Sequence, residues 1–80
     1  MEILFFHAPW CGPCKAYMKN ELPKIEKEHE VHIIDCQADP FTADKYSVRH
    51  IPVLIVLKDG CEVYRGAGKA EQVLEAIQKA

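Results

Sequence analysis

The chain has 80 residues, of which 49% are hydrophobic and 28% charged, with a formal net charge of −2. This length and composition are those of a single globular domain, residues 1–80, with no room for a second core. Lysine and arginine are spread along the chain, so neither a nucleic-acid surface nor a basic membrane-binding patch is expected.

The first half of the chain predicts a strand, a helix and a second strand. Residues 2–7, "EILFFH", form an almost continuous apolar run, typical of a strand covered on both faces, and residues 31–36, "VHIIDC", repeat the pattern. Residues 12–29 have helical periodicity, and one face carries Cys14, Met18, Leu22, Ile25 and His29. Because Pro23 lacks an amide hydrogen, a kink is expected there.

The second half predicts a short helix, a hairpin and a final helix. Asp39 and Pro40 are suited to the N-cap and the first position of the short helix. The runs "IPVLIVLK" and "CEVYRG" are joined by a tight turn at Asp59–Gly60, and "KAEQVLEAIQKA" ends the chain as a helix. The order β-α-β-α-β-β-α predicts an α/β domain with a four-stranded mixed sheet flanked by three helices.

Two cysteines stand at the start of the first predicted helix, in the stretch "APWCGPCKAY". The helical stripe begins at Cys14, so its sulfur is expected to face the packed side. Cys11 lies just before the first turn and is expected to be exposed, where free amides and the helix dipole stabilise a thiolate. One exposed and one shielded thiol form the arrangement that dithiol exchange requires.

The other cysteines and the histidines offer little support for a metal site. Structural zinc needs four ligands, usually including a second close pair, whereas Cys36 and Cys61 lie far apart in the sequence, so no metal is expected. Cys36 ends an apolar strand and is predicted to be a small core residue, and Cys61 is predicted to be exposed. His7 and His50 are candidates for tuning Cys11, because each precedes a loop expected near it.

The stretch "WCGPCK" resembles the active-site motif of the thioredoxin family, and "HIPV" is similar to the family loop that contains a cis proline, here Pro52. The turn "DG" and Gly68 fall where the family has a hairpin turn and a late glycine beside the active site. The resemblance covers essentially the whole chain without the first strand and helix of full-length members. It implies a minimal thioredoxin fold, the size of a glutaredoxin.

The resemblance implies a thiol–disulfide oxidoreductase that reduces protein disulfides, with Cys11 as nucleophile and Cys14 as resolving thiol. Trp10, Gly12 and Pro13 complete the motif, and the substrate groove would include Ile51, Pro52 and Gly68. No bound cofactor is needed beyond the Cys11–Cys14 disulfide itself, and a flavoprotein thioredoxin reductase would supply the electrons. Since the start of the chain has no basic leader and no apolar run is long enough to cross a bilayer, a cytoplasmic monomer is expected.

The chain departs from the family pattern beneath the active site. Family members usually carry a buried aspartate six residues before the first cysteine, paired with a lysine on the next strand. The matching positions here are Phe5 and Ile33, so the proton acceptor for Cys14 is missing. Asp35, later on the same strand, is the nearest candidate substitute.

Two other functions remain open on the sequence. A glutaredoxin-like reductase using glutathione fits the size, but "WCGPC" and "HIPV" differ from the usual glutaredoxin "CPYC" and "TVP", and "RGAGKAEQ" only faintly matches a glutathione site. A non-catalytic accessory subunit would use the fold for binding alone. Turnover by a Cys11→Ser variant distinguishes the accessory subunit from an enzyme.

Overall fold

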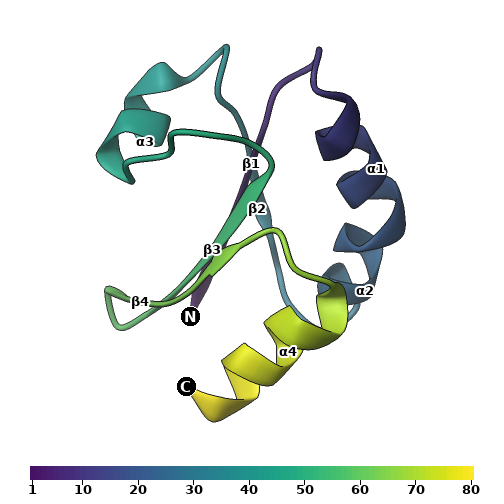
Figure 1. The fold of residues 1–80 in the computed structure, drawn as a ribbon. Helices are drawn as coiled ribbons and strands as arrows, with labels where there is room; N and C mark the ends of the chain where they lie inside the picture. The colour runs from purple at the N-terminus through teal and green to yellow at the C-terminus, as the bar shows by residue number, and fades with distance from the viewer.

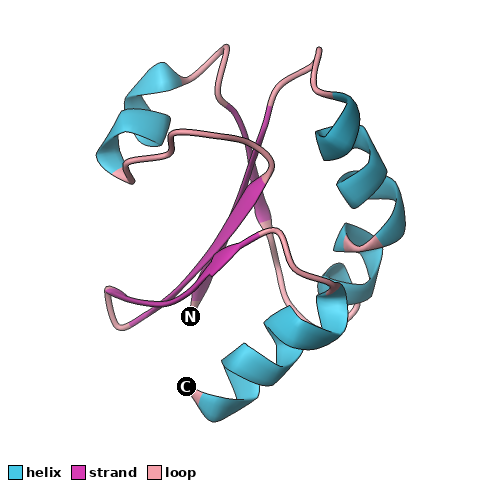
Figure 2. Ribbon diagram, in the orientation of Figure 1, coloured by secondary structure: helices cyan, strands magenta, loops and turns pink.

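The computed structural model describes all 80 residues. In chain order the elements are β1 (Glu2–His7), α1 (Gly12–Asn20), α2 (Leu22–Glu26), β2 (His32–Asp35), α3 (Pro40–Lys45), β3 (Val53–Lys58), β4 (Cys61–Gly66) and α4 (Ala70–Lys79). Figure 1 shows the sheet between two helical layers, and Figure 2 separates helices, strands and loops by colour. The longest helix has ten residues, and none is long and apolar enough to cross a membrane.

The four strands form one mixed sheet in the order β2-β1-β3-β4. β1 and β2 are parallel, whereas β3 is antiparallel to both β1 and β4. The predicted α/β class and mixed sheet are therefore confirmed. α1, α2 and α4 cover one face of the sheet, and α3 covers the other (Figure 1).

The helix predicted over residues 12–29 is two helices, so the domain has four helices and not three. α1 ends at Asn20 and α2 begins at Leu22, with Glu21 between them and Pro23 in the first turn of α2. Proline cannot donate to the carbonyl four residues earlier and its ring crowds that carbonyl, so the helix ends instead of bending. At the break, Glu21 Oε1 accepts a hydrogen bond of 2.8 Å from the amide of Ala70, the first residue of α4.

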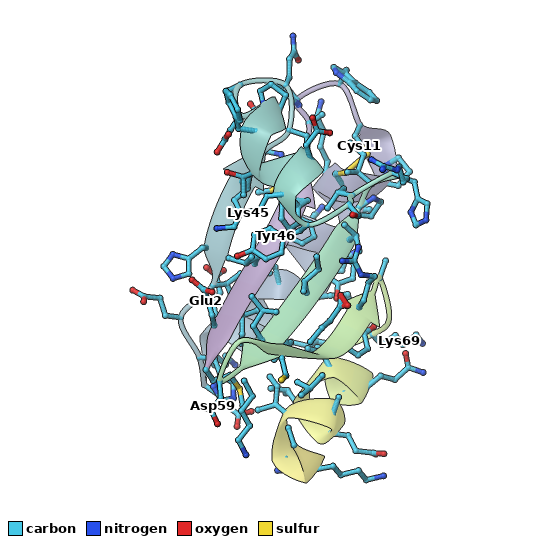
Figure 3. The ribbon with its side chains drawn as sticks, turned by 90° about the vertical axis from the view of Figure 1, so that its left-hand side faces the viewer. Glu2, Cys11, Lys45, Tyr46, Asp59 and Lys69 are labelled. Atoms are coloured by element: carbon cyan, nitrogen blue, oxygen red, sulfur yellow. A yellow bond between two sulfur atoms is a disulfide. The ribbon has the colours of Figure 1, made fainter.

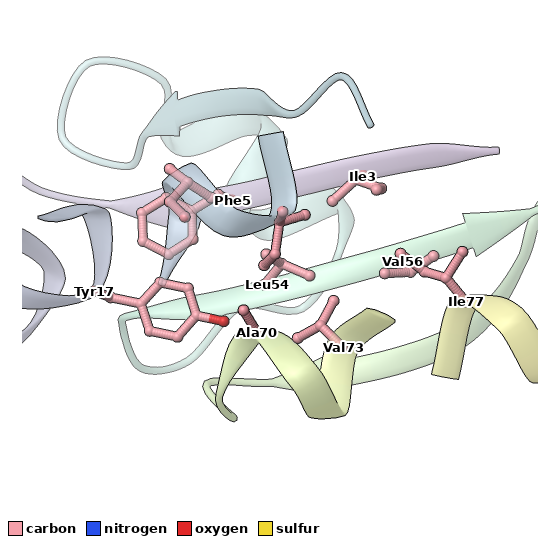
Figure 4. Close-up of a cluster of buried hydrophobic side chains, with 10 residues drawn as sticks. Ile3, Phe5, Tyr17, Leu54, Val56, Ala70, Val73 and Ile77 are labelled. Atoms are coloured by element: carbon pink, nitrogen blue, oxygen red, sulfur yellow. The ribbon is translucent and has the colours of Figure 1, made fainter. Parts of the chain in front are cut away.

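The core occupies both faces of the sheet because the central strands are apolar at successive positions, over residues 3–6 of β1 and 53–57 of β3. Figure 4 shows the cluster on the side of α1, α2 and α4, which consists of Ile3, Phe5, Tyr17, Leu22, Ile25, Leu54, Val56, Ala70, Val73 and Ile77. The cluster under α3 is smaller and consists of Leu4, Phe6, Val53 and Ile55. Alternate residues of β1 and β3 therefore face opposite layers, as the continuous apolar runs predict.

The predicted local signals at α3 and at the hairpin are confirmed. Asp39 is the N-cap of α3 and accepts from the amide of Thr42 at 3.2 Å, and Pro40 is the first helical residue. Asp59 and Gly60 have positive φ values of 52° and 82°, as a tight two-residue hairpin turn requires. Figure 3 shows that this turn lies at the opposite end of the molecule from Cys11.

Candidate active site

Cys11 and Cys14 form a disulfide at the N-terminus of α1, with their Cα atoms 5.3 Å apart (Figure 3). Cys11 is the N-cap residue, with extended backbone, and Pro13 lies in the first turn. The amide of Cys14 donates a hydrogen bond of 3.2 Å to Cys11 Sγ. Since the free amides and the dipole at a helix start favour negative charge, a thiolate on Cys11 would be stabilised at this point.

The expectation that Cys11 is exposed is wrong for the disulfide-bonded protein. Only 5% of Cys11 is exposed, against 0% of Cys14, and both pack with Ala8 and Ile51. The bond to Cys14 draws the Cys11 sulfur toward the helix, and the neighbouring loop covers it. The two sulfurs differ mainly in their place on the helix, with Cys11 at the cap and Cys14 in the first turn.

The loop opposite the disulfide contains the cis Ile51–Pro52 bond that the resemblance implies. Ile51 packs against the cluster of Ala8, Cys11 and Cys14. Pro52 follows it directly and leads into β3. The fold thus brings the loop that contains Pro52 against the two cysteines, although loop and cysteines are far apart in the sequence.

Two hollows adjoin the disulfide. The larger, of about 430 Å³, is lined by Pro13, Ala16, Tyr17, Asn20, Glu21, Pro52 and Ala67. The smaller, of about 200 Å³, is lined by Trp10, Cys36, Ala43, Val48, Arg49, His50 and Ile51. Pro13, which lies between the two cysteines, lines the larger hollow, and Trp10, directly before Cys11, lines the smaller one, so both hollows adjoin the cysteine motif. We call the larger one the α1 groove.

Trp10 is 71% exposed, as expected for an apolar wall beside Cys11. Gly12 is also exposed, with open space around it. Gly68 lies behind the α1 groove, where its carbonyl accepts a hydrogen bond of 2.7 Å from Tyr17 Oη, and the neighbouring Ala67 forms the wall itself. Tyr17 was not predicted to be a site residue, although it lies three residues after Cys14 on the packed side of α1.

The core between β1 and the helix of the cysteines is apolar and aromatic at Phe5. Phe5 is completely buried and stacks on Tyr17, with ring centroids 5.2 Å apart, and on His7, at 6.1 Å. Its register partner on β2 is Ile33, of which 45% is exposed. No polar or charged residue is buried anywhere in the structure. The missing acid is therefore replaced by an aromatic ring.

Asp35, the candidate substitute acid, accepts hydrogen bonds from backbone amides of the turn after β2. Its Oδ1 accepts from the amides of Gln37, at 2.9 Å, and Ala38, at 3.3 Å. These bonds close the turn that follows the strand. The structure therefore gives Asp35 a clear local role and no contact with Cys14.

The remaining cysteines and histidines take no part in the disulfide. Cys61 is exposed, as predicted, whereas Cys36 is only half-buried beside the smaller cluster. Partial burial and the nearby carboxylates of Asp35 and Asp39 raise the pKa of Cys36. His50 lines the smaller hollow beside Trp10. No three His, Cys, Asp or Glu side chains gather as a metal site would require.

Comparisons with known proteins agree with this geometry. Residues 2–79 match the family model Thioredoxin. The chain is 38% identical over 84 residues to thioredoxin of Staphylococcus aureus, covering 99% of this chain and 81% of that protein. It is 35% identical over 78 residues to chloroplastic thioredoxin Y1 of Arabidopsis thaliana, covering 91% of this chain but spanning only 45% of that protein.

The solved structure of thioredoxin 1 from Thermosipho africanus has the same fold. It is 25% identical, with a TM-score of 0.84, and the match covers 99% of this chain and 92% of that chain. A cysteine pair bonded at a helix N-terminus, together with relatives named thioredoxin, identifies a thiol–disulfide oxidoreductase. The chain belongs to the thioredoxin family.

Proposed function

We propose that this chain reduces disulfides in other proteins, with Cys11 as the attacking thiolate and Cys14 as the resolving thiol. The observation that carries the proposal is the position of Cys11 Sγ. It caps α1, accepts the Cys14 amide at 3.2 Å, and is bonded to Cys14 in the oxidised form. A sulfur at this point is both stabilised as an anion and within reach of its partner.

The cycle transfers two electrons to the substrate in two exchanges. The Cys11 thiolate attacks one substrate sulfur, so a mixed disulfide forms, and the other substrate sulfur leaves as a thiolate that takes up a proton. Cys14 then loses its proton and attacks Cys11 Sγ. The Cys11–Cys14 disulfide forms, and the second substrate sulfur is released as a thiol.

The surfaces around the disulfide support a polypeptide substrate. Trp10 offers an exposed apolar ring on one side, and Pro13 and Pro52 line the α1 groove on the other. The backbone of Ile51 would pair with an extended substrate segment as a short added strand. A substrate segment of several residues would contact these surfaces with the residues that flank its cysteine.

The oxidised protein needs a reductant, and family membership supports a flavoprotein thioredoxin reductase. No bound cofactor is required for the exchange, because the cysteine pair itself carries the electrons. We further propose that the protein is a monomer and acts in the cytoplasm. Cys36 and Cys61 remain free thiols in the structure, which fits a reducing compartment.

The test compares two electron donors on a protein disulfide. Wild-type protein, Cys11→Ser and Cys14→Ser are assayed with insulin as substrate, using either NADPH with thioredoxin reductase or glutathione. We expect turnover by wild type with the reductase, none by Cys11→Ser, and a trapped mixed disulfide with Cys14→Ser. Turnover with glutathione alone would favour a glutaredoxin-like reductase, and full activity of Cys11→Ser would contradict a redox role.

A further inference from the structure

Two tyrosine hydroxyls hold the backbone of Gly68 in the loop between β4 and α4. Tyr17 Oη donates to the Gly68 carbonyl at 2.7 Å, and the Gly68 amide donates to Tyr64 Oη at 2.9 Å. Tyr17 belongs to α1 and Tyr64 to β4. The two polar backbone groups of one loop residue are therefore fixed to two different elements of the fold.

Gly68 provides the room that these contacts need. A Cβ atom at this position would lie 2.6 Å from Tyr64 Oη and would also collide with the side chain of Gln72. A side chain at this position would therefore force Tyr64 Oη and the end of Gln72 to move away from the loop. The conformation of the loop thus depends on Gly68 for space and on Tyr17 and Tyr64 for position.

The loop held in this way is a wall of the α1 groove. Ala67, the residue before Gly68, lines the groove opposite Pro52, and Tyr17 lines it as well. The ring of Tyr17 is itself fixed, since it is 7% exposed and stacked on Phe5. Figure 4 shows its hydroxyl directed toward the start of α4. Tyr17 therefore connects the helix of the cysteines to the far wall of the groove.

The hydroxyl of Tyr17 remains a donor over the pH range in which the cysteines react. Burial, and then the proximity of Tyr64 and Glu21, raise its pKa above the ordinary value. The bond to the Gly68 carbonyl is thus kept when a thiol in the site ionises.

We propose that Tyr17 and Tyr64 are positioning residues for polypeptide substrates, because together they hold Ala67 and Gly68 at the width that an extended chain needs beside the disulfide. The inference rests on the proposed reduction of protein disulfides. A small aromatic disulfide reaches Cys11 without filling the α1 groove. Its reduction does not depend on the two hydroxyls.

The test uses Tyr17→Phe, Tyr64→Phe and the double variant, each of which keeps its ring. Tyr46→Phe is the matched control, because its ring packs against Phe6 on the opposite face of the sheet and its hydroxyl makes no hydrogen bond to the loop. Steady-state reduction of insulin and of a small aromatic disulfide is measured for all variants, with thermal unfolding to confirm the fold.

For each single variant we expect KM for insulin to rise about threefold to tenfold, the range given by the loss of one neutral hydrogen bond. We expect kcat, the rate with the small disulfide, and the control to be unchanged. An unchanged KM overturns the proposal, and so does an equal loss on both substrates, which leaves the tyrosines a structural role only. If wild type reduces the small disulfide but not insulin, the proposed function itself fails, and this is seen without any variant.

Discussion

Phe5 of β1 and Tyr17 of α1 lie stacked in the core between the sheet and the helix of the cysteines, with ring centroids 5.2 Å apart and ring planes 13° from parallel. Phe5 is fully buried, and it occupies the position where family members usually carry an aspartate. The resolving step must therefore move a proton from Cys14 in surroundings that offer no buried carboxylate.

We expect the resolving step to be slow near neutral pH and to accelerate as pH rises. A thiolate is poorly solvated in apolar surroundings, and each tenfold decrease in its population corresponds to about 1.4 kcal/mol. Stopped-flow reduction of a peptide disulfide, followed from about pH 6 to about pH 9, measures this dependence. A flat profile would show that the proton has another route.

Phe5→Asp restores an acid at this position. We expect the neutral-pH rate of resolution to rise, and the free energy of unfolding to fall by several kcal/mol, because an unpaired carboxylate is buried and the stack on Tyr17 is lost. Phe5→Leu is the control, since it removes the ring without adding an acid. If both variants give the rate of wild type, then water already accepts the proton.

In the reduced protein, Cys11 should react with iodoacetamide about tenfold faster than Cys14 at neutral pH. Cys11 Sγ caps α1 and accepts an amide hydrogen bond, whereas Cys14 is completely buried in the first turn. Mass mapping of the adducts over time separates these two from the exposed Cys61. Equal or reversed rates for the pair would contradict the assignment of nucleophile and resolving thiol.

Pro52→Ala should impair the reduction of a protein disulfide several-fold more than that of a small aromatic disulfide. Pro52 lines the α1 groove with Pro13, and Ile51 directly before it packs on Cys11, so the loop lies where an extended substrate would be aligned. The ratio of kcat/KM for the two substrates, compared with wild type, measures the difference. An equal loss on both substrates would mean that Pro52 supports the disulfide and not the alignment of a chain.

Asp39→Ala should lower stability at neutral pH, and this difference should shrink in acid. Hydrogen bonds from Thr42 lower the pKa of Asp39 below its ordinary value of 3.8. A carboxyl group with a lowered pKa in the folded state stabilises that state above the ordinary value, and this stabilisation is lost as pH falls through the folded pKa.

Urea unfolding from about pH 6 down to about pH 3 measures this effect. Asp39→Asn is the matched control, because asparagine accepts the same bond at the N-cap without a titrating charge. Its stability should not show the loss in acid that is assigned to Asp39. A difference between Asp39→Ala and wild type that stays constant as pH falls would contradict the prediction.

The strands and the cysteine motif could be predicted because their signals are local. The apolar run at residues 2–7 and the stretch at 61–66 become β1 and β4 with the predicted bounds. Pro23 correctly indicated an interruption, but its severity was underestimated. Whether proline bends a helix or ends it depends on the tertiary contacts at the break, and here the Glu21 side chain binds the first amide of α4.

The α1 groove could not be predicted, because its parts meet only through tertiary contacts. Tyr17 and Gly68 are 51 positions apart, and no periodicity in the sequence links them. The exposure of Cys11 was also misjudged, because the helical pattern gives the direction of a side chain but not what the neighbouring loop covers. Ile51, which packs on Cys11, reaches it from the loop before β3.

The interruption at Glu21 gives the active-site helix a second attachment. Glu21 at the end of α1 holds the first amide of α4, while Tyr17, about one turn earlier on α1, holds the carbonyl of Gly68. Both ends of the short segment that carries Ala67 into α4 are thus fastened to one helix. Any movement of α1 on opening of the disulfide is therefore expected to carry Ala67 with it, so that the distance between the helix and this wall of the groove stays the same.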